Sequence, residues 1–348
     1  MPQKRDPIQR VADGEDLYDV TSWDDRTSLD HFAVRLHAWL TRGSRWAVVG
    51  LAILILLAQF LIVGAATIQN PILGVYVLFS VVPAAALVVY VWRMDVTMRE
   101  PLPMLVITFV LGFLFAGFAA VLNTVLKGVV TAIPLVGMVL FFWVVVGPVE
   151  ETVKWLAVRL YAFRSEKFDA VVDGAVYGAA AGLGFATIEN TIYITGQFLS
   201  AANSATMQAG LAQAFQTATL RTFAGPGHVI YSAFAGYYLG LAKFNPDNRG
   251  PIVVKGLVIA AGIHAFYNTA VTYMDPVLRM VAPGIAANWG TLVFIGFVFV
   301  YDGFFLYVLY RKLSRYRQKY EELGAEKAYE DPFEDLTPAV EYVGDDRP

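Results

Sequence analysis

The chain has 348 residues, of which 57% are hydrophobic and only 16% charged, and its mean hydropathy is +0.54. Because soluble domains carry about a quarter of charged residues, the composition predicts an all-α polytopic membrane protein. The formal net charge is −3 and no basic tract indicates a nucleic-acid partner. Cysteine is absent, which excludes disulfides, thiolate nucleophiles and cysteine-ligated metals. Any nucleophile or metal site must therefore use oxygen or imidazole nitrogen.

Both ends of the chain are polar. Residues 1–30 are acidic and turn-rich, and we expect a disordered cytoplasmic tail. In residues 31–44, apolar side chains recur at helical spacing beside arginines, which predicts an amphipathic helix on the membrane surface. Residues 312–348 form a second charged cytoplasmic tail, which we expect to be mostly disordered.

Between these ends, residues 45–311 are predicted to form a transmembrane domain of about eight helices. Segments long enough to cross a ~30 Å hydrocarbon layer lie at 45–66, 71–92, 103–126, 131–163, 169–199, 224–243, 251–274 and 288–311. With eight crossings, all 26 Lys and Arg residues except Lys127, Arg221 and Arg279 fall on the side of the two termini. The positive-inside rule then predicts a multi-pass protein of the cell membrane with both termini in the cytoplasm.

Two further patterns concern the helices around the predicted fifth and sixth spans. The segment 200–222 is too polar to cross, and its glutamines oppose apolar residues, so we expect an amphipathic helix on the outer surface. Gly174, Gly178 and Gly182 stand four residues apart, which predicts close packing of one helix backbone against another.

Three charges interrupt the predicted fourth span, within the stretch PVEETVK at 148–154. A charge at this depth is costly unless it is partnered or used, so it indicates a functional site by default. Glu150 and Lys154 stand four residues apart on one helix face, where we expect an ion pair. Glu151 points about 100° away from that face and needs another partner. Pro148 is expected to kink the helix just before the acidic pair.

Three more polar residues, Glu189, His228 and His264, lie in other predicted spans. A helical rise of ~1.5 Å per residue places them, with Glu150, in the middle or outer half of the bilayer. His228 follows Gly-Pro-Gly, which we interpret as a helix start that favours a neutral imidazole. Side chains four residues away can fix these groups or contact substrate: Phe185 and Tyr193 beside Glu189, Ser232 beside His228, and Asn268 beside His264.

These residues allow three interpretations. In the first, Glu189, His228 and His264 bind zinc with a fourth position open to water, and Glu150 or Glu151 is the general base. In the second, no metal is present; a glutamate activates water, while the two histidines and Asn268 stabilise the oxyanion. In the third, the polar residues serve only helix packing or ion passage. Asp302, in the last predicted span, has no evident partner.

At these residues the chain resembles the PrsW family of intramembrane proteases, relatives of the CAAX prenyl proteases. The matching pieces fall in family order between about 145 and 270: Glu150-Glu151 with Lys154, Asp173-Gly174 with Tyr177-Gly178, Gly182 to Asn190 with Phe185 and Glu189, Gly227-His228 with Ser232, and His264 with Asn268. Each piece alone is weak, but the joint match is specific.

The resemblance implies a CAAX-protease-like helical core over 138–274 and a membrane-embedded metallopeptidase. It implies that Glu150 and Glu151 are catalytic and that Glu189, His228 and His264 lie at the site. Similar proteins make the first cut in a membrane-bound anti-sigma factor on its outer side, so a membrane-anchored protein is the expected substrate. The alternatives are a CAAX-type peptidase acting on prenylated C-termini, and an inactive scaffold or transporter.

Overall fold

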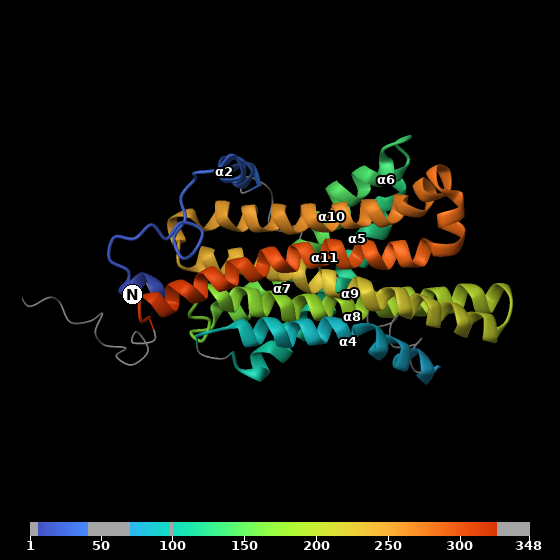
Figure 1. The fold of residues 1–348 in the computed structure, drawn as a ribbon, viewed down its shortest axis with the longest axis horizontal. Helices are drawn as coiled ribbons and strands as arrows, with labels where there is room; N and C mark the ends of the chain where they lie inside the picture. Colours follow the sequence, from blue (N-terminus) through green and yellow to red (C-terminus); the bar gives the residue numbers. More distant parts are fainter. Residues whose placement is uncertain (1–5, 41–69, 98–99, 326–348) are drawn as a thin grey trace, which may run out of the picture.

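The computed structural model describes residues 6–40, 70–97 and 100–325, and its regular elements in these ranges are all helices (Figure 1). The α-helices are α1 (Pro7–Val11), α2 (Ser28–Leu40), α4 (Pro71–Met94), α5 (Leu102–Thr131), α6 (Gly137–Leu140), α7 (Gly147–Leu160), α8 (Val171–Ser204), α9 (Met207–Lys243), α10 (Arg249–Val281) and α11 (Pro283–Glu322). A π-helix, η1 (Phe141–Val146), joins α6 to α7, and short 3₁₀ helices η2 (Ala162–Arg164) and η3 (Pro246–Asn248) follow α7 and α9.

An antiparallel pair of long helices, α8 and α9, forms the centre of the bundle (Figure 1). Small residues allow the two backbones to meet. A Cβ added at Gly174, Gly178 or Gly182 would lie 2.1, 2.2 or 2.5 Å from a carbonyl oxygen of α9. Any larger residue would therefore push the helices apart. The oxygen facing Gly182 belongs to His228, so this packing also fixes the height of a site residue.

The remaining helices surround this pair. α4 packs against both α8 and α9, α5 packs against α8, and α10 and α11 pack against α9. By length and composition, α4, α5, α8, α10 and α11 are apolar enough to cross a membrane. The structure thus supports a multi-pass membrane protein with five such helices among the described residues. It does not confirm eight, and the predicted span 45–66 lies outside the described residues.

The predicted span 131–163 is not one helix. α5 continues to Thr131, a turn follows in which Leu135 has a φ of +66°, and the chain then runs back through α6, η1 and α7. η1 ends directly before Gly147-Pro148, where α7 begins. Because proline lacks an N–H and crowds the preceding turn, a π-helix at this point accommodates it. η1 ends four residues before Glu150.

The expectation of a separate surface helix over 200–222 is wrong. α8 runs on to Ser204, and α9 is continuous from Met207 to Lys243. The two helices therefore form one long hairpin, whose turn lies at the right of Figure 1. We call this the hairpin end of the bundle, and the opposite end, where α11 finishes near the start of the described chain, the terminal end. Pro226 lies inside α9, so the predicted helix start before His228 is also wrong.

The first described residues also differ from the expected disordered tail. Residues 6–27, here called the N-terminal segment, fold against the terminal end of the bundle. Ile8, Val20 and Trp23 are at most 4% exposed and belong to the main hydrophobic cluster. Its acidic residues pair with bundle lysines, as in the 2.5 Å contact from Lys312 to Asp19. The high acidic content thus reflects ion pairing. α2 follows and packs along α10.

Candidate active site

The acidic pair on α7 is buried and its two members face different partners. Glu150 is 5% exposed and Glu151 is fully buried. Lys154 Nζ lies 2.6 Å from Glu151 Oε1, three residues back along the helix. The predicted Glu150–Lys154 pair is therefore wrong, because the lysine takes the i,i+3 partner instead of the i,i+4 one. The lysine ammonium also lies 4.2 Å above the ring of Phe185, where a cation–π contact adds to the pairing.

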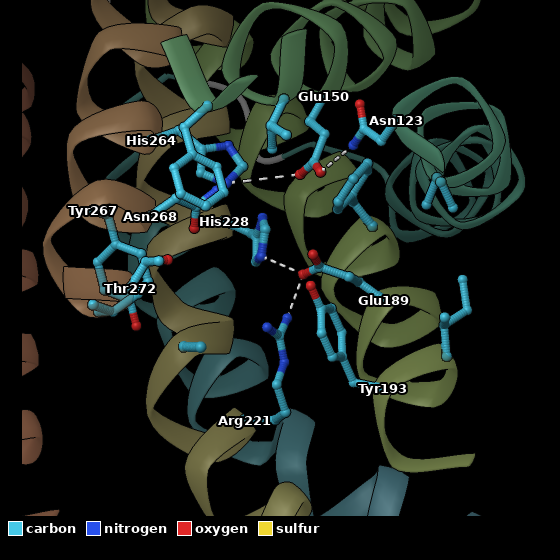
Figure 2. A pocket seen from close by; sticks show the side chains of 18 of the residues that line it. Asn123, Glu150, Glu189, Tyr193, Arg221, His228, His264, Tyr267, Asn268 and Thr272 are labelled. Carbon is cyan, nitrogen blue, oxygen red and sulfur yellow. Dashed lines mark hydrogen bonds and ion pairs between the residues drawn. The ribbon is translucent and has the colours of Figure 1, made fainter. Parts of the chain in front are cut away.

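Glu150 is held through one of its two oxygens. Asn123 Nδ2, on α5, donates to Glu150 Oε1 at 2.9 Å (Figure 2). Glu150 Oε2 is buried and has no hydrogen-bond partner. It lies 3.7 Å from Nε2 of His264. A buried carboxylate oxygen without a donor is uncommon, so this atom has room for a ligand, a water or an ion.

His264, on α10, links the two glutamates. Its Nδ1 lies 2.9 Å from Glu151 Oε1, the oxygen that also accepts from Lys154. Because a carboxylate oxygen only accepts, Nδ1 carries the proton and Nε2 has a free lone pair. That lone pair faces Glu150 Oε2. Two hydrogen-bond acceptors this close repel each other unless a proton or a cation lies between them. We therefore expect a proton or a cation between His264 Nε2 and Glu150 Oε2.

His228, on α9, lies between two charged groups. Its Nδ1 is 3.0 Å from Lys154 Nζ and its Nε2 is 2.7 Å from Glu189 Oε2. An ammonium can only donate, so Nδ1 accepts and Nε2–H donates to Glu189. The imidazole makes an edge-to-face contact with the ring of His264, with ring centres 5.2 Å apart. His228 is thus oriented by its side-chain partners and not by a helix terminus.

Glu189, on α8, is anchored by Arg221 from α9 (Figure 2). The guanidinium also donates from Nε to Asn190 Oδ1 at 2.7 Å and lies 4.7 Å above the ring of Tyr193. Three residues from one stretch of α8 therefore hold a single arginine. Arg221 in turn fixes the carboxylate that orients His228.

A cavity of about 720 Å³ connects these groups. Glu150, Glu189, His228 and His264 line it, and so do the expected residues Phe185, Tyr193 and Asn268 (Figure 2). The other expected residues do not line it: Glu151, Lys154 and Asn190 lie behind the first group, and Ser232 is buried between α8 and α9. The structure therefore separates residues that face the cavity from residues that hold them.

Among the cavity residues that sequence reasoning missed, Asn123 and Arg221 are the ones that bond the glutamates Glu150 and Glu189. Asn123 is a polar residue within the apolar sequence of α5, and Arg221 is one of the few cations outside the basic side of the chain. Both features can be seen in the sequence, but neither indicates which glutamate the side chain contacts. Asp302, whose partner was unknown, accepts a 3.0 Å hydrogen bond from Tyr231, whose ring packs 5.5 Å from that of His264.

A divalent metal fits part of this arrangement well. Glu150, His228 and His264 each offer a ligand atom within 4.8 Å of the others. The 3.7 Å between Glu150 Oε2 and His264 Nε2 is close to the ~3.3 Å that two ligands of a tetrahedral zinc would show. His228 can join through Nε2 only if it gives up its hydrogen bond to Glu189. The candidate ligand set in the structure is thus Glu150, His228 and His264. The sequence had suggested Glu189 as the carboxylate ligand.

Together, the fold and the site define a polytopic helical membrane protein with a buried centre of glutamates and histidines beside a cavity. A family model described as PrsW family intramembrane metalloprotease matches residues 100–306. This match covers more than half of the chain, which belongs to that family and is an intramembrane protease.

Relatives named as proteases agree with this assignment. Protease PrsW of Bacillus subtilis is 28% identical over 213 residues, which is 60% of this chain and 88% of the relative. Protease PrsW of Shouchella clausii is 28% identical over 193 residues, 55% and 81% of the two chains. Protease PrsW of Clostridioides difficile is 26% identical over 193 residues, 55% and 76%. No solved structure matches the chain.

Proposed function

We propose that this chain hydrolyses a peptide bond of a membrane-anchored protein in the cavity beside Glu150. The observation that carries the proposal is Glu150 Oε2, a buried carboxylate oxygen with no hydrogen-bond partner on the cavity wall. Asn123 fixes the other oxygen of the same carboxylate. Glu150 is thus immobilised with one reactive oxygen left free, which is the arrangement a general base requires.

The other residues divide into two roles. Asn268 lines the same cavity as Glu150, and its side-chain amide can donate to the oxygen of a polarised carbonyl. Glu151 and Lys154 hold the two imidazoles from behind, so they act as positioning residues. Glu189, held by Arg221, orients His228 from the opposite side. The catalytic role expected for Glu151 is therefore assigned here to Glu150 alone.

Glu150, His228 and His264 would hold the metal ion of a family of metalloproteases, and zinc suits this donor set. When bound, the ion would supply a water of lowered pKa and a Lewis acid for the substrate carbonyl. A bound ion would take the free Oε2 of Glu150 as one of its ligands, and in its absence Glu150 Oε2 would accept the proton of the attacking water.

The position of the cavity supports a cut in the outer half of the membrane. Its lining on α8 runs from Phe185, just before the middle of the helix, to Gln197 near the hairpin end. Most basic residues lie toward the terminal end, which by the positive-inside rule is cytoplasmic. The substrate class that fits is a single-span protein cut near its outer boundary, as for the anti-sigma-factor-like substrate that the family resemblance implies.

Reconstitution tests this function directly. Purified protein and a single-span test protein in the same liposomes should give a cleaved product. Glu150→Gln and His264→Ala should each lower the cleavage rate on the order of 10³-fold. Asp275→Asn is the matched control, because Asp275 forms only an exposed ion pair with Arg279 on α10. Retained cleavage in both site variants would overturn the proposal.

A further inference from the structure

A second group of acidic residues lies far from the candidate active site. Asp95 directly follows α4, Glu100 precedes α5, and Asp173 lies in the first turn of α8. Each offers a carboxylate oxygen within 4.8 Å of the others, and we call the three residues the acidic cluster. Asp173 stands 16 residues before Glu189 on α8, a distance of about 24 Å. The function proposed above uses none of the three.

Each carboxylate of the acidic cluster uses one oxygen for protein donors and leaves the other free. Asp95 Oδ1 accepts from Thr97 N at 2.9 Å and from Thr97 Oγ1 at 2.7 Å. Glu100 Oε2 accepts from the hydroxyl of Tyr177. Asp173 Oδ2 accepts from Asp169 N at 2.7 Å and from Ala170 N at 2.8 Å. These donors orient the carboxylates but carry no positive charge.

The second oxygens have no partner. Asp95 Oδ2, Glu100 Oε1 and Asp173 Oδ1 are all buried and accept no hydrogen bond. Glu100 is 2% exposed and Asp173 is fully buried. Among the described residues, no lysine, arginine or histidine forms an ion pair with any of them. Three buried carboxylates with free oxygens, and with no counter-charge among the residues that the structure describes, would strongly oppose folding unless protons or a cation neutralise them.

We propose that the acidic cluster binds one divalent cation of the Ca²⁺ or Mg²⁺ class. An all-oxygen donor set selects these hard ions over zinc. Two of the three ligands are rigid, because Asp173 caps α8 and Tyr177 fixes Glu100. The bound ion would neutralise the cluster and tie together the adjoining ends of α4, α5 and α8. The inference does not depend on the proposed protease mechanism.

Mn²⁺ serves as a spectroscopic probe for this site. The His264→Ala variant removes one histidine of the active site, so it should retain one equivalent of Mn²⁺ that Ca²⁺ or Mg²⁺ displaces. In the same His264→Ala background, the double variant Asp95→Asn, Glu100→Gln leaves the Asp173 cap of α8 intact and should lose this binding. Asp275→Asn, at an exposed acid elsewhere, should keep it. Electron paramagnetic resonance titration measures all four preparations, including the unchanged chain.

Thermal unfolding with and without Ca²⁺ provides a second measurement, which remains informative if a substitution itself lowers the stability of the protein. Ca²⁺ in hundredfold excess over its Kd should raise the Tm of the unchanged protein by about 5 °C or more. The double variant should show no shift, and its Tm in chelator should equal or exceed that of the unchanged protein in chelator, because the buried charges are gone. Absence of both Mn²⁺ binding and a Tm shift in the unchanged protein would overturn the proposal and indicate carboxyl groups that share protons. Equal Mn²⁺ binding by the double variant would also overturn it.

Discussion

At the scale of single residues, neighbours decide the roles of two adjacent glutamates. Glu151 is surrounded by Lys154 and His264, which occupy its Oε1. Each of the two carboxylates keeps one oxygen without a hydrogen-bond partner, but of the two only Glu150, which accepts from Asn123, lines the cavity. The sequence shows two identical side chains in the same hydrophobic run, so only the packing of α5 and α10 around them separates the reactive group from the supporting one.

Arg221 provides a prediction at this scale. Its guanidinium holds Glu189, and Glu189 orients His228. We expect Arg221→Gln to slow cleavage by roughly 10- to 100-fold, as for other partners that orient a site group. Arg221→Lys should restore part of the rate, because it keeps the charge but not the bond to Asn190. Rates measured with the reconstituted single-span substrate test this.

A double-mutant cycle separates this role from a general loss of stability. If Arg221 acts through Glu189, adding Arg221→Gln to Glu189→Gln should cost little more than Glu189→Gln alone. Arg279→Gln is the matched control, since that arginine pairs with an exposed aspartate on the surface. Fully additive effects in the cycle, or an equal loss in the control, would contradict the role assigned to Arg221.

Sequence reasoning could find the site residues that are costly in a membrane, but not their contacts. Glu150, Glu189, His228 and His264 stand out because each interrupts an apolar segment. The pairing of Lys154 was predicted wrongly because i,i+3 and i,i+4 partners are equally close on a helix. The contact of Arg221 with Glu189 spans 32 residues, and no helical periodicity indicates a contact across two helices.

At the scale of elements, the N-terminal segment shows how a polar tail can become part of a membrane protein. Asp6 is fully buried and accepts hydrogen bonds from Ile8 N, Val171 N and Tyr316 O–H. It thereby caps α1 and α8 and contacts α11. Composition alone suggested disorder, because the segment is acidic and poor in apolar residues. The lysines of the bundle that neutralise its acidic side chains lie far away in the sequence.

Asp6 gives the attachment of this segment a predictable pH dependence. Burial raises the pKa of the Asp6 carboxyl from 3.8 to about 7. Because the folded-state pKa is the higher one, Asp6 stabilises docking fully below pH 3.8, and this contribution is lost as pH rises through about 7. Each pH unit in that window should cost at most about 1.4 kcal/mol. Hydrogen exchange at the amides of residues 8–23, measured from pH 5 to 8, should therefore show weaker protection against opening at the higher pH.

Asp6→Asn is the control for that measurement. The amide oxygen can still accept from Ile8 N and Tyr316 O–H, but it does not titrate. After correction for the intrinsic exchange rate, its protection should be nearly constant over the same pH range. A variant with unchanged pH dependence, or stronger protection of the unchanged protein at pH 8, would show that another group controls docking.

At the scale of the whole molecule, hydropathy predicted the class of protein but not the path of the chain. Five predicted spans correspond to α4, α5, α8, α10 and α11. The sixth is the second half of α9, whose first half is too polar to be read as membrane helix. The fourth is interrupted by η1. The two failures have different causes: polar residues hide the first half of α9, whereas the turn at Leu135 and the π-helix before Pro148 interrupt an apolar stretch that reads as one span.

The most direct test of the account compares Glu150→Gln with Glu189→Gln in one set of preparations, measuring both bound metal and cleavage of the reconstituted substrate. We predict that Glu150→Gln loses cleavage and any bound zinc together. Glu189→Gln should keep the zinc and cleave more slowly, because Glu189 only orients His228. If Glu150→Gln cleaves normally while Glu189→Gln is inactive and metal-free, the reactive centre lies at Glu189 and the assignment to Glu150 is wrong.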